Sequence, residues 1–217
     1  MTQQEIVSLV VFVSMCVVCC FTGAVVRRWL LNRCFPAFRF EPWLFEPIRQ
    51  SDLTDEQRQF FAKHTPVYLA RGFEPLGDFL LRRDARPSVV RFFLSRDRTT
   101  VGELTWYLDT TTIGCMSVLL DGFFLESGTG EVQVLPPAEH GLQFFMLPQE
   151  DAPGLIDLHA ASVAGVAAER RTSPAKIERD DVKALANYGR ELSLRSLHKQ
   201  GVIDELPAFL RKKQAAC

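Results

Sequence analysis

The sequence lacks an excess of charge of either sign. It holds 25 Lys and Arg residues against 26 Asp and Glu residues, and its formal net charge is -1 at pH 7. A nucleic-acid-binding surface concentrates basic side chains against phosphates, whereas here the basic run Arg211-Lys212-Lys213 stands alone near the end of the chain. We therefore predict no nucleic-acid partner.

A disulfide framework is also missing. Three of the six cysteines fall inside one apolar segment, one follows it, one is isolated and one is terminal: Cys16, Cys19, Cys20, Cys34, Cys115 and Cys217. Widely separated thiols suit a reducing compartment. The first three share one helical face, where a soft-metal site or a helix-pairing seam is conceivable, but cysteine as a small apolar residue is the simpler interpretation. Cys115 is interpreted as a core residue.

Recognisable motifs for catalysis, metal binding and phosphate binding are absent as well. The four histidines, His64, His140, His159 and His198, have neither H-x-x-x-H nor H-E-x-x-H spacing. The glycine-containing stretch 127–130 precedes a strand-like segment rather than a helix, so we interpret it as a hairpin loop. We predict no catalytic residue, no metal and no cofactor.

Several polar residues have ordinary structural explanations. Glu103, Asp109 and Glu126 fall on or beside strand-like runs and are interpreted as outward-facing positions. Asp157 and His159 stand two positions apart on a predicted helix, so their side chains diverge and cannot form a dyad. We interpret His159 as a helix residue that contacts the sheet.

What the sequence does have is one long apolar run. Residues 6–26 carry no charge, and about 20 apolar residues are enough for a helix to cross a bilayer. The run predicts a single transmembrane helix over residues 6–28, with the lipid bilayer as a partner. A cleaved signal peptide is the alternative, because Thr22-Gly23-Ala24 is a suitable cleavage pattern, although the preceding MTQQE has no basic residue.

The charges that flank this run predict its orientation. Glu5 precedes it, whereas Arg27, Arg28 and Arg33 follow it. Basic residues near a span prefer the cytoplasmic side. We therefore predict a single-pass protein of the cell membrane, with residues 1–5 outside the cytoplasm and the rest of the chain after the anchor inside it.

Residues 29–50 interleave aromatic rings with arginines and prolines. Aromatic rings prefer the level of the lipid headgroups, which predicts a juxtamembrane segment at the interface. The predicted interface residues are Arg27, Arg28, Trp29, Arg33 and Trp43. In the alternative interpretation, the aromatic side chains pack onto the folded domain as a collar.

The folded domain begins with a helix signal. Thr54 followed by Gln57 forms a capping box, which predicts a helix over residues 55–64. Pro66 is expected to interrupt or restart this helix, and Gly72 is placed to end it.

Short β-rich runs follow. They cover residues 73–81, 88–95, 101–108, 115–120, 123–127, 131–135 and 142–147. Because the spacing leaves no room for crossover helices, we predict an antiparallel meander. Asp121-Gly122 predicts a two-residue type I′ hairpin turn.

Two helices are predicted to close the domain, over residues 154–171 and 174–200. Ser173 before Pro174 fits an N-cap followed by proline at the first helical position, and Gly201 fits a C-cap. Together these elements predict an α+β domain, with boundaries at 51–205 and a C-terminal tail at 206–217.

Three pairs of adjacent phenylalanines occur on the predicted strands: Phe92-Phe93, Phe123-Phe124 and Phe144-Phe145. Successive strand residues point to opposite faces, so both faces of the sheet should be covered. The helices of the chain itself are the favoured cover, and a protein partner, the membrane or an apolar ligand are the alternatives.

Function is predicted only as a class. Our first hypothesis is an interaction or scaffold module that binds a membrane or cytoplasmic protein. The alternative is a domain that binds or senses an apolar, lipid-like ligand in the manner of helix-grip folds, an analogy of element order alone. Its pocket would be lined by Phe93, Phe124 and Phe145. An enzyme is the third hypothesis.

The predicted orientation can be tested with two reporters. A reporter that is active only outside the cytoplasm, fused after Cys217, should be inactive, because the anchor would leave this end of the chain in the cytoplasm. A cytoplasmic reporter at the same position serves as the control and should be active. The opposite pair of results would overturn the predicted orientation.

Overall fold

The computed structural model describes residues 42–82, 87–107, 110–130, 141–147 and 151–199. The predicted anchor over residues 6–28 and the predicted interface residues Arg27, Arg28, Trp29 and Arg33 lie outside these ranges. None of the helices in the described ranges has the length and apolar character that a membrane crossing requires.

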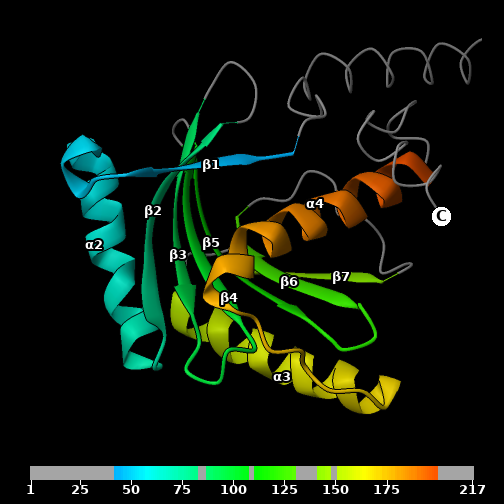
Figure 1. Ribbon diagram of the computed structural model, residues 1–217. Helices are drawn as coiled ribbons and strands as arrows, with labels where there is room; N and C mark the ends of the chain where they lie inside the picture. Colours follow the sequence, from blue (N-terminus) through cyan, green and yellow to red (C-terminus); the bar gives the residue numbers. More distant parts are fainter. Residues whose placement is uncertain (1–41, 83–86, 108–109, 131–140, 148–150, 200–217) are drawn as a thin grey trace, which may run out of the picture. The chain divides into compact units, whose positions relative to one another are not determined.

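The described residues form an α+β domain around a seven-stranded sheet. The strands are β1 (Leu44–Ile48), β2 (Glu74–Arg82), β3 (Ser88–Leu94), β4 (Val101–Tyr107), β5 (Thr110–Val118), β6 (Phe124–Thr129) and β7 (Leu142–Leu147). They lie side by side in the order of the sequence, and β1 to β6 pair antiparallel (Figure 1). The predicted α+β class and the mostly antiparallel sheet are confirmed.

The meander prediction is wrong for the last pair of strands. β7 runs parallel to β6, with Phe124 opposite Leu142 and Thr129 opposite Leu147. A parallel pair needs a connection of about a dozen residues to return the chain to the same end of the sheet, and residues 130–141 are long enough for this. The strand predicted over residues 131–135 lies outside the described residues.

β1 was not predicted, because its residues were assigned to the juxtamembrane segment. Next to β1, Trp43 donates its backbone N–H to Asn187 Oδ1 at 2.8 Å, and the Arg190 guanidinium lies 5.0 Å from the Trp43 ring centre. Phe45 packs on Phe92 at a ring-centroid distance of 5.5 Å. For Trp43 and Phe45 the structure therefore supports the collar interpretation, and the folded domain starts before the predicted boundary at residue 51.

Helices cover both faces of the sheet. α2 (Asp55–Ala70) and α3 (Ala152–Arg170) pack on one face, and α4 (Val182–Lys199) packs on the other (Figure 1). Successive side chains of β3 point to opposite faces of the sheet. Phe93 belongs to the core under α2, and its neighbour Phe92 belongs to the core under α4.

The prediction from the phenylalanine pairs is confirmed. In each pair, one ring packs on the α4 side and the other on the side of α2 and α3. The rings on the α4 side are Phe92, Phe124 and Phe144, and those on the opposite side are Phe93, Phe123 and Phe145. The helices of the chain itself therefore cover both faces of the sheet.

α2 begins at the predicted capping box but continues past Pro66. Gln57 N donates to Thr54 Oγ1 at 3.3 Å, and Thr54 N donates to Gln57 Oε1 at 3.0 Å. Proline inside a helix costs about 3 kcal/mol. Packing beyond it offsets this cost, because the buried Tyr68 donates to Gly114 O at 2.7 Å and stacks on Phe93 at 4.5 Å.

The second C-terminal helix does not start at Pro174. The chain from Ser173 to Ile177 is instead held to the end of β5 and to the β3–β4 loop. Leu120 N donates to Ser173 O at 2.9 Å, Ala175 N donates to Val118 O at 2.8 Å, and Ile177 N donates to Arg98 O at 2.7 Å. A 3-10 turn (Arg179–Asp181) then leads into α4. These long-range hydrogen bonds outweigh the local N-cap signal of Ser173.

The turn at Asp121-Gly122 is present, but it is not type I′. That turn needs a positive φ at both central residues, whereas only Gly122 has one, at 82°. Gly122 N donates to Leu119 O at 2.9 Å, and Leu119 N donates to Phe123 O at 2.8 Å. The connection is therefore a three-residue hairpin loop that ends in a left-handed glycine.

The Tyr68 contact provides a stability test. A Cβ at Gly102 would lie 2.3 Å from Tyr68 Cε1, and the Tyr68 ring is fixed against Phe93. Gly102→Ala should therefore lower the free energy of unfolding by roughly 1–3 kcal/mol, measured by thermal unfolding. In the matched control, Gly165→Ala on α3 meets no atom within 4 Å and should raise it by about 0.5–1 kcal/mol. Equal effects of the two substitutions would contradict this packing.

Candidate functional site

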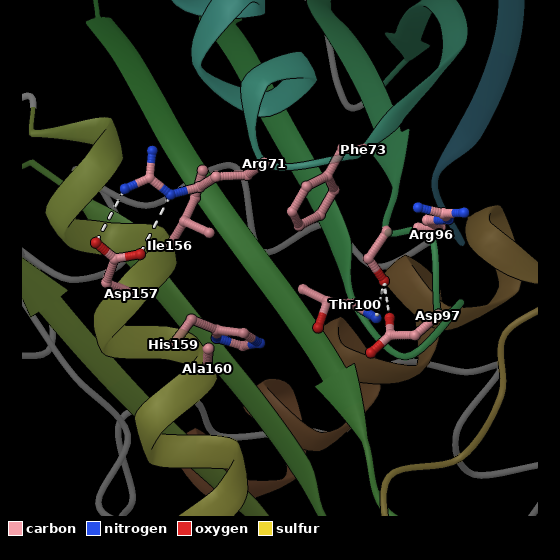
Figure 2. A pocket seen from close by; sticks show the side chains of 10 residues that line it. Arg71, Phe73, Arg96, Asp97, Thr100, Ile156, Asp157, His159 and Ala160 are labelled. Carbon is pink, nitrogen blue, oxygen red and sulfur yellow. Dashed lines mark hydrogen bonds and ion pairs between the residues drawn. The ribbon is translucent and has the colours of Figure 1, made fainter.

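An open pocket of about 650 Å³ lies beside the sheet (Figure 2). Arg71 and Phe73, at the junction of α2 and β2, line one side, and Ser95, Arg96, Asp97 and Thr100 of the β3–β4 hairpin line a second. The turn of α3 from Ile156 to Ala160 lines the third. Pockets of this size commonly hold small molecules.

The hairpin side of the pocket is held by hydrogen bonds within the loop. Ser95 N donates to Thr100 O at 2.9 Å, and Ser95 Oγ accepts from the backbone N–H groups of Thr99 and Thr100 at 3.1 and 3.0 Å. Ser95 Oγ in turn donates to Asp97 Oδ1 at 2.7 Å. Burial opposes ionisation of Asp97, but these hydrogen bonds from Ser95 and Thr99 outweigh it and lower the pKa of the carboxyl. Asp97 is therefore a carboxylate at neutral pH.

An ion pair joins α2 to α3 at the opposite side of the pocket. Arg71 contacts Asp157 through two hydrogen bonds of 2.9 and 3.2 Å. The hydrogen bonds from Arg71 lower the pKa of Asp157. Because the Asp157 side chain is 70% exposed, water screens the ion pair and its contribution to stability is small. Its main consequence for the pocket is that the two charges neutralise each other.

His159 also lines the pocket, and its buried side chain connects α3 to the sheet. His159 Nε2 is hydrogen-bonded to Ser117 Oγ of β5 at 2.9 Å, and Nδ1 to Ser127 Oγ of β6 at 2.8 Å. Ser117 Oγ is hydrogen-bonded to Thr100 Oγ1 at 3.0 Å. A continuous chain of hydrogen bonds therefore runs from Thr100 in the pocket to Ser127 inside the domain.

His159 is neutral in the folded protein. Burial lowers the pKa of its imidazole to about 4, and the residue is 1% exposed. A neutral imidazole has one donor and one acceptor nitrogen, so it satisfies one serine hydroxyl on each side. The interpretation of His159 as a helix residue that contacts the sheet is confirmed, and Asp157 pairs with Arg71 instead of with His159.

Sequence reasoning did not find Ser117 and Ser127. Serine is common in every kind of segment, and these two are ten positions apart in the chain. They face His159 because of the antiparallel register of β5 and β6, in which Cys115 lies opposite Ser127 and Ser117 opposite Leu125. A register of this kind becomes visible only when the strands are paired.

The three phenylalanines predicted to line a ligand pocket lie in different places. Phe93 stacks on Tyr68 under α2, Phe124 packs on Tyr188 of α4, and Phe145 packs under α3. Phe93 and Phe124 lie on opposite faces of the sheet, so the three rings do not line one cavity. None of them lines the pocket of Figure 2.

The interpretation of Cys115 is confirmed by the structure, whereas that of residues 127–130 is wrong. Cys115 is 1% exposed, and burial raises the pKa of its thiol to about 12. A thiol of this kind is not a nucleophile at neutral pH, so the interpretation as a core residue is confirmed. The interpretation of residues 127–130 as a hairpin loop is wrong, because residues 127–129 belong to β6, where pairing with β7 extends the strand.

Glu103 and Glu126 are half-buried rather than fully exposed outward-facing residues. Glu103 lies over Gly114 on the α4 side of the sheet, where a Cβ on Gly114 would be 2.9 Å from Glu103 Cγ. Burial, and then the negative charge of Glu103, raise the pKa of Glu126 to about 8. Glu126 is therefore mostly protonated at pH 7. Asp109 lies outside the described residues.

In the described part of the chain, no group of three or more His, Cys, Asp and Glu side chains is arranged to hold a metal ion. No known protein family, curated protein or solved structure matches this chain. The class of the protein is therefore defined by its own geometry, as an α+β domain with a pocket of mixed polar and apolar lining.

Burial of His159 predicts a specific sensitivity to acid. In the unfolded chain the imidazole has a pKa near 6.5, whereas in the folded protein its pKa is about 4. Between these pH values the unfolded state therefore binds a proton that the folded state does not bind. The free energy of unfolding should therefore fall between pH 6.5 and pH 4, by on the order of 3 kcal/mol. His159→Gln retains a donor and an acceptor but does not titrate, so its loss over this range should be smaller by that amount. Parallel denaturation profiles of the two proteins would contradict the buried, neutral imidazole.

Proposed function

We propose that this chain is a membrane-anchored ligand-binding protein, whose domain binds a small molecule in the pocket between α2, α3 and the β3–β4 hairpin. The observation that carries the proposal is the pocket itself. It combines an apolar wall of Phe73, Ile156 and Ala160 with the hydroxyl of Thr100 and charged side chains. An apolar wall with a few hydrogen-bonding groups is the usual composition of a small-molecule site.

The pocket supports a ligand of mixed polarity rather than the apolar ligand expected from the sequence. Its lining includes Arg71, Arg96, Asp97 and Asp157. A lipid tail or a similar apolar molecule would remove these charged groups from water without replacing their hydrogen bonds, which is costly. The phenylalanine rings that suggested an apolar ligand are used in packing between the sheet and its helices.

Binding is better supported than catalysis. Acyl transfer and related reactions need a nucleophile in contact with a base, whereas in the described residues Thr100 reaches His159 only through Ser117. The imidazole between the two serines is occupied by structural hydrogen bonds on both nitrogens. An enzyme therefore stays the third hypothesis.

The anchor over residues 6–26 would hold this domain at the membrane. In the orientation predicted from Arg27 and Arg28, the domain would lie in the cytoplasm, and its pocket would bind cytoplasmic ligands close to the bilayer. A membrane-bound domain that binds a small molecule would serve as a sensor or a carrier.

An interaction or scaffold module is the second candidate. It predicts a contiguous apolar patch on the surface. The large exposed apolar side chains of the described residues are Leu44, Leu69 and Leu120, on β1, α2 and the β5–β6 turn. Their distribution over three elements gives this candidate less support than the pocket gives to ligand binding.

A pair of substitutions on α3 tests the proposal. Ala160 is exposed and lines the pocket, whereas Ala164, one turn later, is also exposed and does not line it. We expect some members of a metabolite library to raise the thermal midpoint of the full-length protein by several degrees through binding. Ala160→Phe should fill the pocket and abolish this increase, and the control Ala164→Phe should retain it.

Two results would contradict the proposal. One is a library in which no compound raises the midpoint of the wild-type protein. The other is a set of stabilising compounds that act equally on Ala160→Phe and Ala164→Phe, because these compounds would bind elsewhere.

A further inference from the structure

Two basic and two acidic side chains line the pocket, and only one basic and one acidic side chain form an ion pair with each other. Of the four charged lining residues, Arg71 and Asp157 pair with each other. The other two, Arg96 and Asp97, are consecutive residues of the β3–β4 hairpin. Neither forms an ion pair with any other described residue. Within the described ranges, the pocket therefore offers one cation and one anion that form no ion pair.

The Asp97 carboxylate is held in place by hydrogen bonds within the loop. Asp97 is ionised and is held by Ser95 and Thr99, so its carboxylate is fixed in position. Figure 2 shows Asp97 beside Thr100, whose hydroxyl also lines the pocket. The Thr100 hydroxyl has one donor and two acceptor sites and uses only part of them in its contact with Ser117. Arg96 lies on the same hairpin, next to Asp97.

Charge complementarity limits what this pocket can bind well. A ligand with only a negative group could pair with Arg96 but would lie near the Asp97 carboxylate, and a ligand with only a positive group would meet the opposite problem with Arg96. Like charges brought together and charged groups desolvated without a partner both oppose binding. A ligand that carries both charges satisfies both residues.

We propose that the ligand is a small zwitterion with an apolar part, of the kind that an apolar α-amino acid represents. Its carboxylate would pair with Arg96, whose planar guanidinium suits a carboxylate. Its ammonium group would pair with Asp97 and donate to Thr100, and its apolar part would lie against Phe73, Ile156 and Ala160. This inference rests on the proposed function, since it names the ligand class of the same pocket.

Three probes that share one aromatic ring separate the alternatives. Phenylacetate carries only the carboxylate, 2-phenylethylamine carries only the amine, and L-phenylalanine carries both. Isothermal titration of each probe into the full-length protein in detergent should give the tightest binding for L-phenylalanine, by at least tenfold over either of the others. Ala160→Phe should abolish this binding, and Ala164→Phe should not.

Charge-neutralising substitutions test which residue pairs with the carboxylate of the ligand and which pairs with its ammonium group. Arg96→Gln and Asp97→Asn should each weaken L-phenylalanine binding at least tenfold, and Asp97→Asn retains an oxygen that can accept the hydrogen bonds of the loop. Asp97→Asn should also improve binding of phenylacetate relative to 2-phenylethylamine, while Arg96→Gln should do the reverse. The control is Arg98→Gln, which removes a charge from the same hairpin at a residue that pairs with Glu178 and does not line the pocket. It should leave the affinity unchanged.

The outcomes distinguish failure of this inference from failure of the proposed function. If a singly charged probe binds as tightly as L-phenylalanine and Ala160→Phe abolishes that binding, the pocket is a ligand site but the zwitterion is wrong. The same conclusion holds if none of the three probes binds while an unrelated metabolite binds and is excluded by Ala160→Phe. If no small molecule shows binding that depends on Ala160, both the inference and the proposed function are overturned.

Discussion

The architecture depends on a sheet whose strands are apolar on both faces. Burial of apolar surface is the dominant favourable term in folding, so a sheet of this kind is stable only when both faces are covered. α2 and α3 share one face and α4 takes the other. The pocket lies where the cover on the first face is incomplete, between the end of α2, the side of α3 and the β3–β4 hairpin.

Two polar contacts in this apolar interior fix where the helices lie. Tyr68 donates to the Gly114 carbonyl beneath α2, and His159 is hydrogen-bonded to Ser117 and Ser127 beneath α3. A buried polar group without a partner costs about 1–3 kcal/mol, so a shift of either helix along the sheet would be unfavourable. The walls of the pocket therefore keep a defined separation.

The pocket combines this fixed shape with two charges that form no ion pair with the other described residues. The Arg71–Asp157 pair joins two of its walls, whereas Arg96 and Asp97 stand on a hairpin held by its own hydrogen bonds. Residues of a rigid loop on a rigid sheet are common recognition groups, because binding requires little ordering of the chain. Together with the anchor proposed from residues 6–26, this arrangement suits a membrane-bound sensor or carrier of a small polar molecule.

The sequence by itself determined the features that depend on neighbouring residues. The capping box of Thr54 and Gln57 and the two-faced phenylalanine pairs needed no tertiary information, because hydrogen bonds over three residues and the alternation of a strand are local. Tertiary structure decided the parallel direction of β7, the late start of α4 and the chain of hydrogen bonds through His159. Each of these depends on contacts between distant segments, and their energies outweighed local signals such as Ser173. The pocket belongs to the same group, since its three walls come from parts of the chain that only folding brings together.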